Sequence, residues 1–201
     1  GHRAHVGPLR EMEMSEEVLV TAANGIIEVT INRPEARNAM TKAAAEAIAA
    51  AMDRLDAEAA EVLRVAAVIG REFSRGVLES VVEAPVDLTG ALERLKTSGL
   101  VQQIAVVPEP TYRFKHALTE EVAYDSLLEH QRATLHGAVG RGIEQRYAGR
   151  LDEHVGRLAH HFSRANAWND AVRYGVLSAD RATELSWNAE ALQTLARVEE
   201  W

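Results

Sequence analysis

The chain has 201 residues, 47% of them hydrophobic and 26% charged, which is an ordinary composition for a globular protein with a buried core. Thirty acidic residues outweigh 22 basic ones, and the formal net charge of -8 argues against a broad nucleic-acid-binding face. The sequence contains no cysteine, which excludes disulfides, thiolate metal sites and cysteine nucleophiles.

The first 16 residues carry no clear structural signal. Gly1 to Pro8 lack the hydrophobic segment of a secretory signal, and Met14 followed by Ser15 looks like a natural start. We therefore expect 1–16 to be a disordered leader. No apolar run reaches the roughly 18 residues that a membrane-spanning helix needs, so we expect a cytoplasmic protein that does not enter membranes.

The segment 17–60 begins with a hairpin pattern. Apolar residues alternate with polar or small ones on both sides of Asn24-Gly25, a pair that suits a tight type I′ turn. An isolated hairpin is marginal in water, so 17–31 is expected to be weakly protected or to self-associate through an exposed edge. A loop with Pro34 follows, and the stripe Ile48, Met52 and Leu55 then predicts a helix over 41–56.

The loop carries the pattern N-R-P-x-x-x-N-A, from Asn32 to Ala39. It resembles the N-terminal part of crotonase-fold enoyl-CoA hydratases, and this resemblance implies a loop near the CoA moiety. Those enzymes hold a thioester enolate with backbone N–H groups, one of them in a glycine-rich loop further along the chain. Here Arg75 and Leu78 stand where that loop would have alanine and aspartate, so the pattern gives no intact crotonase site.

The segment 61–116 predicts three helices and a hairpin. The first helix ends at Gly70, a residue suited to a left-handed C-cap, and Ser74 caps a second helix that runs to about Glu83. Asp87 starts a third helix over 87–98. Two short β runs at 101–107 and 112–114 complete the layout of a winged-helix subdomain.

The segment 117–201 predicts a helical arm. Apolar stripes at helical spacing indicate four helices, and antiparallel helix pairs of this length suggest tetratricopeptide-like repeats. The stripes are Leu128, Leu135, Val139 and Ile143; Val155, Leu158, Ala159 and Phe162; Trp168, Val172, Val176 and Leu177; and Ala189, Leu192 and Leu195.

Three motifs in 62–199 point to one family. They are V-I-G-R-E-F at 68–73, F-K-H-A-L at 114–118 and L-A-H-H-F at 158–162. Together they resemble the STAND class of signalling ATPases, which includes adenylate-cyclase-fused and LuxR-type regulators. The resemblance implies an ATPase core before the winged helix and a helical sensor arm after it. It also implies that His116 reaches the nucleotide's phosphates, whereas the plain alternative is a structural histidine hydrogen-bonded to backbone at a helix start.

Other candidate sites are weaker. His154, His160 and His161, with Glu153, lack the H-E-x-x-H spacing of a zinc site, and we expect no metal. The phosphate-binding pattern G-x-x-x-x-G-K-[ST] is missing, and Gly137, Gly140 and Gly142 lie in a helical pattern, so we expect no bound cofactor. A DNA-binding interpretation would place Arg94 and Lys96 on the recognition helix, but acidic neighbours there make nucleic acid an improbable partner.

The sequence therefore predicts a mainly α-helical (α+β) fold, with an N-terminal hairpin and helix, a winged-helix subdomain and a helical-repeat stub. The favoured function is a non-catalytic regulatory or protein-interaction fragment of a STAND-type ATPase, whose partner is another protein or the missing ATPase domain. One alternative is a truncated or fused crotonase-family acyl-CoA hydratase or isomerase without an intact active site. The other is a winged-helix DNA binder.

Overall fold

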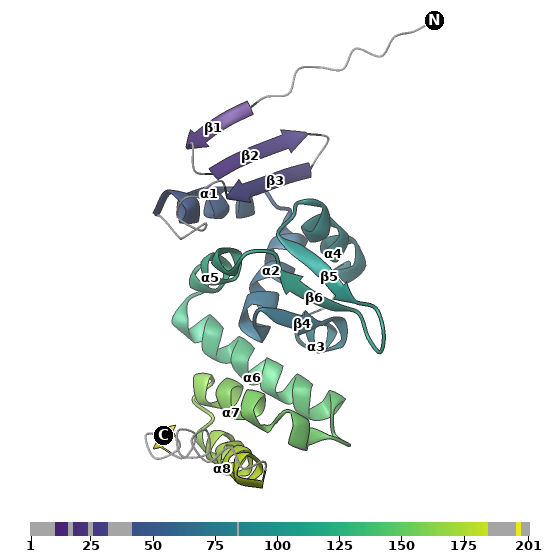
Figure 1. The fold of residues 1–201 in the computed structure, drawn as a ribbon, viewed down its shortest axis with the longest axis vertical. Coiled ribbons are helices and arrows are strands. Elements are labelled where there is room, and N and C mark those ends of the chain that lie inside the picture. Colours follow the sequence, from purple (N-terminus) through teal and green to yellow (C-terminus); the bar gives the residue numbers. More distant parts are fainter. Residues whose placement is uncertain are drawn as a thin grey trace, which may run out of the picture.

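A computed structural model describes residues 11–15, 18–23, 26–31, 42–83, 85–184 and 196–197. These residues form an elongated molecule with its elements arranged along the long axis broadly in chain order (Figure 1). The described part is mainly helical and contains two three-stranded antiparallel sheets. None of its helices is long and apolar enough to cross a membrane.

The first sheet contains the expected hairpin and one further strand. Its strands follow in the order β1 (Glu11–Ser15), β2 (Val18–Ala23) and β3 (Ile26–Ile31). Val18 pairs with Ile31 and Ala23 with Ile26, which confirms the hairpin register; Asn24 and Gly25 lie outside the described residues. The expectation of a disordered leader was wrong for 11–15, because this segment pairs with the edge of β2.

Helix α1 (Lys42–Met52) lies beside β2 and β3. It is shorter than the expected 41–56 because Asp56 caps the next helix, where its carboxylate accepts the Ala59 N–H at 2.9 Å. The N-R-P-x-x-x-N-A motif at 32–39 lies outside the described residues.

The middle of the molecule holds three helices and the second sheet. In chain order they are α2 (Ala57–Ile69), β4 (Glu72–Ser74), α3 (Arg75–Val81), α4 (Leu88–Thr97), β5 (Val101–Ala105) and β6 (Thr111–Phe114). The sheet order is β4-β6-β5, so β6 is the central strand. The helices expected within 62–83 and 87–98 are confirmed, and β4 is a strand that the pattern did not predict.

Helix ends in this region follow their capping residues. Ser74 Oγ accepts the Val77 N–H at 3.3 Å, as expected of an N-cap. Gly70 ends α2 with φ +119° and ψ −177°, an extended conformation open to glycine rather than the expected left-handed helical one. After α4, Gly99 has φ +72° and the Leu100 N–H reaches the Leu95 carbonyl, which forms a Schellman motif.

The far end is the helical arm. It consists of α5 (Ala117–Asp125), α6 (Glu129–Arg146), the short 3-10 helix η2 (Leu151–Glu153), α7 (Val155–Arg164) and α8 (Trp168–Glu184). Helix α7 packs against both α6 and α8. The stripe from Ala189 to Leu195 lies outside the described residues.

The expected stripe on α8 does not face the core. Trp168, Val172, Val176 and Leu177 are 37–45% exposed. The buried face instead carries Ala171, Tyr174 and Ala179. Small residues let α7 approach closely, and Tyr174 stacks on Phe162 with ring centroids 5.7 Å apart. The periodic pattern correctly predicted an amphipathic helix here, but it assigned the wrong face of that helix to the core.

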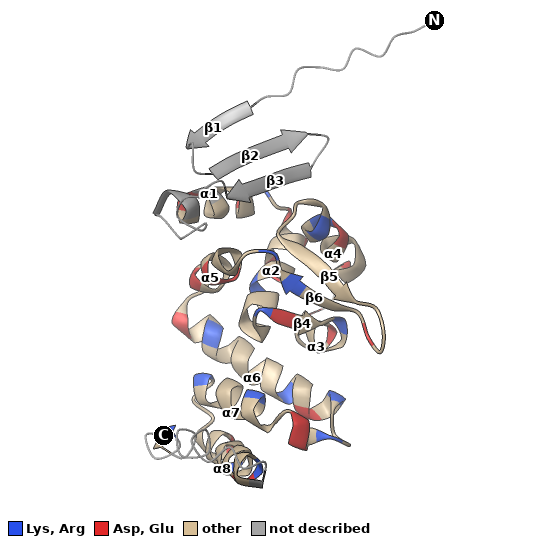
Figure 2. Ribbon diagram, in the orientation of Figure 1, with Lys and Arg blue, Asp and Glu red and all other residues tan. Residues whose placement is uncertain are grey.

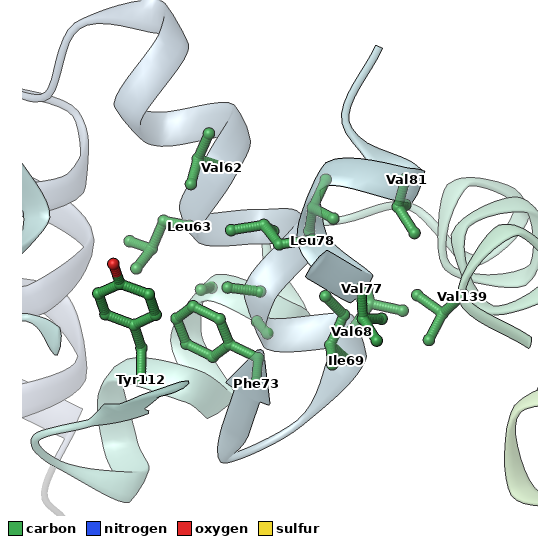
Figure 3. Close-up of a cluster of buried hydrophobic side chains, with 14 of the residues drawn as sticks. Val62, Leu63, Val68, Ile69, Phe73, Val77, Leu78, Val81, Tyr112 and Val139 are labelled. Atoms are coloured by element: carbon green, nitrogen blue, oxygen red, sulfur yellow. The ribbon is translucent and has the colours of Figure 1, made fainter. Parts of the chain in front are cut away.

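One continuous core joins these parts. A single cluster of buried residues extends from Ile48 in α1 to Tyr174 in α8. Figure 3 shows its centre, where Phe73 and Tyr112 stack beneath α2 and Val139 of α6 reaches toward Val77 of α3.

Two glycines of α6 lie in different surroundings. A Cβ on Gly140 would lie 2.9 Å from the ring of Phe162, a buried side chain already stacked on Tyr174. A Cβ on Gly137 would meet its nearest neighbour, Ala165, at an ordinary 3.5 Å. The close approach of α7 therefore depends on Gly140 and not on Gly137.

We expect opposite effects from alanine at these two positions. Gly137→Ala should raise the free energy of unfolding by about 0.5–1 kcal/mol, because alanine favours the helix interior. Gly140→Ala should lower it, because displacement of Phe162 outweighs the same helix preference. Urea denaturation of both variants measures the difference. A Gly140→Ala protein as stable as Gly137→Ala would contradict the close packing of α6 and α7.

Candidate functional site

His116 lies at the junction between β6 and α5. It is the N-cap residue of α5, with extended backbone angles and no side-chain capping hydrogen bond. Its carbonyl accepts the Thr119 N–H at 3.1 Å. Partial burial, reinforced by the neighbouring Lys115 charge, lowers the pKa of His116 below its ordinary value. This favours a neutral imidazole, which can donate from one ring nitrogen and accept at the other.

The backbone before His116 is held from both sides. The Phe114 N–H donates to the Arg71 carbonyl, and the Lys115 N–H donates to the Leu100 carbonyl, each at 3.1 Å. The Phe114 side chain is fully buried against Phe73. The start of α5 is thus fixed to the loops after α2 and α4.

A cavity of about 310 Å³ lies along α5, beginning one turn after His116. The C-terminal end of α2 forms one wall, and polar residues of α5, α6 and α7 form the others: Glu120, Glu121, Tyr124, Asp125, His136, His160 and Arg164. Burial raises the pKa of Glu120, although Arg71 opposes the shift. His116 itself does not line the cavity.

A hydrogen-bonded chain of side chains joins three helices beside this cavity. The hydroxyl oxygen of Tyr124 on α5 lies 3.0 Å from Nε2 of His136 on α6. Nδ1 of His136 in turn lies 2.9 Å from Nδ1 of His161 on α7. One Nδ1 must donate and the other accept, so the contact requires at least one imidazole to be neutral. Both histidines are only 2% exposed. Sequence patterns did not single out His136, whose one signal is its place among the apolar positions of α6.

Burial dominates the titration of this pair. It lowers the pKa of His136 to about 4 and that of His161 to about 2, and neighbouring cationic groups push in the same direction. On α7 these include His160 and Arg164, and on α6 Arg132, whose guanidinium also lies over the Tyr124 ring. The pair is therefore neutral near pH 7.

The other sequence candidates are dispersed. His154 precedes α7 and stacks on Tyr147 with ring centroids 4.1 Å apart, whereas His160 and His161 face His136. Within the described residues, no three or more His, Asp or Glu side chains are arranged to hold a metal ion. Gly137, Gly140 and Gly142 lie inside α6, not in a phosphate-binding loop.

The basic residues of α4 are engaged by carboxylates. Arg94 pairs with Asp56 at 2.7 Å and with Glu58 at 3.1 Å, and Lys96 pairs with Glu93 at 2.9 Å. Figure 2 shows both signs of charge on this helix. These contacts reduce the positive charge that α4 could offer to a phosphate backbone.

No protein-family model matches this chain, and no solved structure matches it. Among curated proteins it is similar to an uncharacterized protein of Rhizobium meliloti (strain 1021), with 26% identity over 182 residues. The match covers 90% of this chain and 18% of the relative, so the chain spans less than a fifth of that protein's length. A match of this coverage includes residues on both sides of residue 60.

The histidine pair predicts a specific dependence of stability on pH. Because the folded-state pKa values lie below the ordinary 6.5, the unfolded chain binds more protons at lower pH. The stability that the neutral pair contributes is complete above pH 6.5, and it is lost as the pH falls toward the folded-state pKa values of about 4 for His136 and about 2 for His161. His161→Asn keeps a hydrogen-bonding group but does not titrate, so its stability should fall by about 2 kcal/mol less than that of the parent between pH 7.5 and 5.

Urea unfolding at the two pH values measures this loss, with His130→Asn as the control at an exposed position on α6. Equal losses in the parent and His161→Asn would show that the pair does not titrate as buried neutral imidazoles.

Proposed function

We propose that this chain is a non-catalytic regulatory and protein-interaction region of a STAND-type signalling ATPase, acting in the cytoplasm. It would comprise a winged-helix subdomain at 61–116 and the beginning of a helical sensor arm at 117–201. The observation that carries the proposal is the order of elements from α2 to β6, followed directly by packed helices.

The arrangement of the second sheet supports the winged-helix assignment. Three helices, α2, α3 and α4, precede a hairpin of β5 and β6, and β4 adds a third strand on the open edge of β6. Loop 106–110 would be the wing. The V-I-G-R-E-F motif then spans the end of α2 and the start of β4, and F-K-H-A-L spans the end of β6 and the start of α5.

The arm supports the second part of the proposal. Short connections join α6, α7 and α8, as expected of stacked antiparallel helix pairs. The L-A-H-H-F motif lies in α7, where Leu158 and Phe162 are core residues and His161 binds His136. The small share of the relative that this chain covers is consistent with one region of a larger protein.

Within this proposal His116 is the nucleotide-sensing residue. Its imidazole is only partly buried, makes no capping bond and stands on a fixed strand end. A neutral ring in that position could donate to a phosphate oxygen presented by an adjoining ATPase domain. The role itself rests on the family resemblance.

The leading alternative is a crotonase-derived acyl-CoA enzyme. Its support is the motif at 32–39 and the strands β2 and β3 that precede it. However, residues 63–69 are helical, whereas the alternative needs a strand leading into an oxyanion loop. Hydration of crotonyl-CoA by the purified chain, abolished by a point substitution within it, would favour this alternative.

DNA binding is not favoured by any contact described above. Arg94 and Lys96 pair with carboxylates, and loop 106–110 contains Glu109 but no basic residue. A wing that enters the phosphate-lined surface of DNA ordinarily supplies positive charge.

The test uses the natural full-length polypeptide that contains this region. We expect it to bind ADP, and we expect His116→Gln to weaken that binding about tenfold, the loss of one hydrogen bond to a charged phosphate. Isothermal titration calorimetry measures the affinity. His130→Gln, an exposed histidine on α6, should bind as the parent does. A full-length protein that binds neither ADP nor ATP, or that binds ADP equally well with His116→Gln, would contradict the proposal.

A further inference from the structure

Loop 106–110, the proposed wing, is attached at its base to the helical arm. Glu109 accepts hydrogen bonds from Arg146 at 2.9 and 2.5 Å and from the Tyr147 hydroxyl at 2.6 Å. Arg146 is the last residue of α6 and Tyr147 is its C-cap. Charged partners make such hydrogen bonds stronger than neutral ones. Three hydrogen bonds to the Glu109 carboxylate therefore join the loop to the end of α6.

The surroundings of this contact favour one geometry. Tyr147 is buried, with the His154 ring stacked at 4.1 Å and the Arg150 guanidinium 5.3 Å from the ring centroid. Arg146 crosses α3 at Gly76, where a Cβ would lie within 1.9 Å of the guanidinium carbon. Only glycine leaves room for Arg146 to reach Glu109 by this route.

The carboxylate stays charged within this contact. Burial alone would raise the pKa of Glu109, but the hydrogen bonds from Tyr147 and Arg146 outweigh it and hold the pKa below its ordinary value. The ion pair is thus maintained across the neutral pH range.

Rigid backbone connects Glu109 to His116. The next residue, Pro110, accepts the Arg75 N–H through its carbonyl at 2.8 Å. The chain then enters β6, which pairs with β4 on one side and β5 on the other. Two further backbone bonds, from Phe114 and Lys115, hold the end of β6 just before His116. Because β6 is hydrogen-bonded along both edges, bending it locally would disturb ladder bonds to β4 and β5.

We propose that loop 106–110 is an internal strut that couples the end of α6 and the start of α7 to the strand that ends at His116. Movement in the arm would reach β6 through Tyr147, Arg146 and Glu109. The regulatory meaning, that a signal received by the arm alters nucleotide sensing at His116, rests on the proposed function. The coupling itself does not.

Two pairs of variants provide matched tests of the strut. Glu109→Gln removes the charge that joins loop and arm, and Glu72→Gln removes an ion pair with Arg113 that lies wholly within the sheet. His154→Ala removes the ring stacked on Tyr147. His154→Phe keeps a ring there and removes only the polar edge, whose buried Nε2 has no hydrogen-bond partner.

Amide hydrogen exchange of the intact chain, without nucleotide, gives the readout at Thr111–Phe114. We expect Glu109→Gln and His154→Ala each to accelerate exchange there at least tenfold, and Glu72→Gln and His154→Phe less than threefold. The double variant Glu109→Gln/His154→Ala should exchange no faster than the more affected single variant, because both act through one path.

Three results would each contradict the strut. Amide exchange could accelerate only at 106–110, or Glu109→Gln and Glu72→Gln could accelerate exchange at 111–114 equally. The third is a double variant in which the two accelerations multiply. Because no nucleotide is present, these results are independent of the outcome for His116 in ADP binding. The coupling and the proposed function can therefore fail separately.

Discussion

The burial of α2 is the constraint on which the rest of this fold depends. Nine of its thirteen residues are buried, and their positions run around the helix rather than along one stripe. Such a helix is stable only inside a shell, and α3, α4, α5, α6 and β4 all pack against it. The same shell places His116 at the start of α5 and the end of α2 at the wall of the adjoining cavity. The burial of α2 therefore determines both the packing of the surrounding elements and the position of the candidate site.

Local signals in the sequence predicted much of this arrangement. Ser74 and Asp87 cap their helices because a short oxygen-bearing side chain can bind a free N–H at the first turn, and that chemistry needs no tertiary context. Strand β4 escaped prediction because it has three residues, and its partner β6 lies some forty residues further along the chain. The sequence patterns also did not predict the roles of Glu109 and His136, because these residues have partners that are distant in the sequence. Their partners, Arg146 and His161, become neighbours only after folding.

Several ion pairs join elements that are distant in the sequence. Three arginines pair with carboxylates of another element: Arg94 joins α4 to the start of α2, Arg113 joins β6 to β4, and Arg146 joins α6 to loop 106–110. Figure 2 shows positive charge on β6 beside negative charge on β4. Exposed pairs contribute little stability individually. These three pairs connect elements within the chain, and they leave their arginines less available to a phosphate backbone.

One core unites the middle of the molecule with the helical arm. The three tryptophans, Trp168, Trp187 and Trp201, all lie near the C-terminus, so a Trp187→Phe/Trp201→Phe variant leaves Trp168 of α8 as a probe of the arm alone. Urea unfolding of that variant should give coincident midpoints by Trp168 fluorescence and by far-UV circular dichroism, which reports all helices. A fluorescence transition completed at a urea concentration where most helical signal remains would contradict a shared core and leave the arm an independent unit.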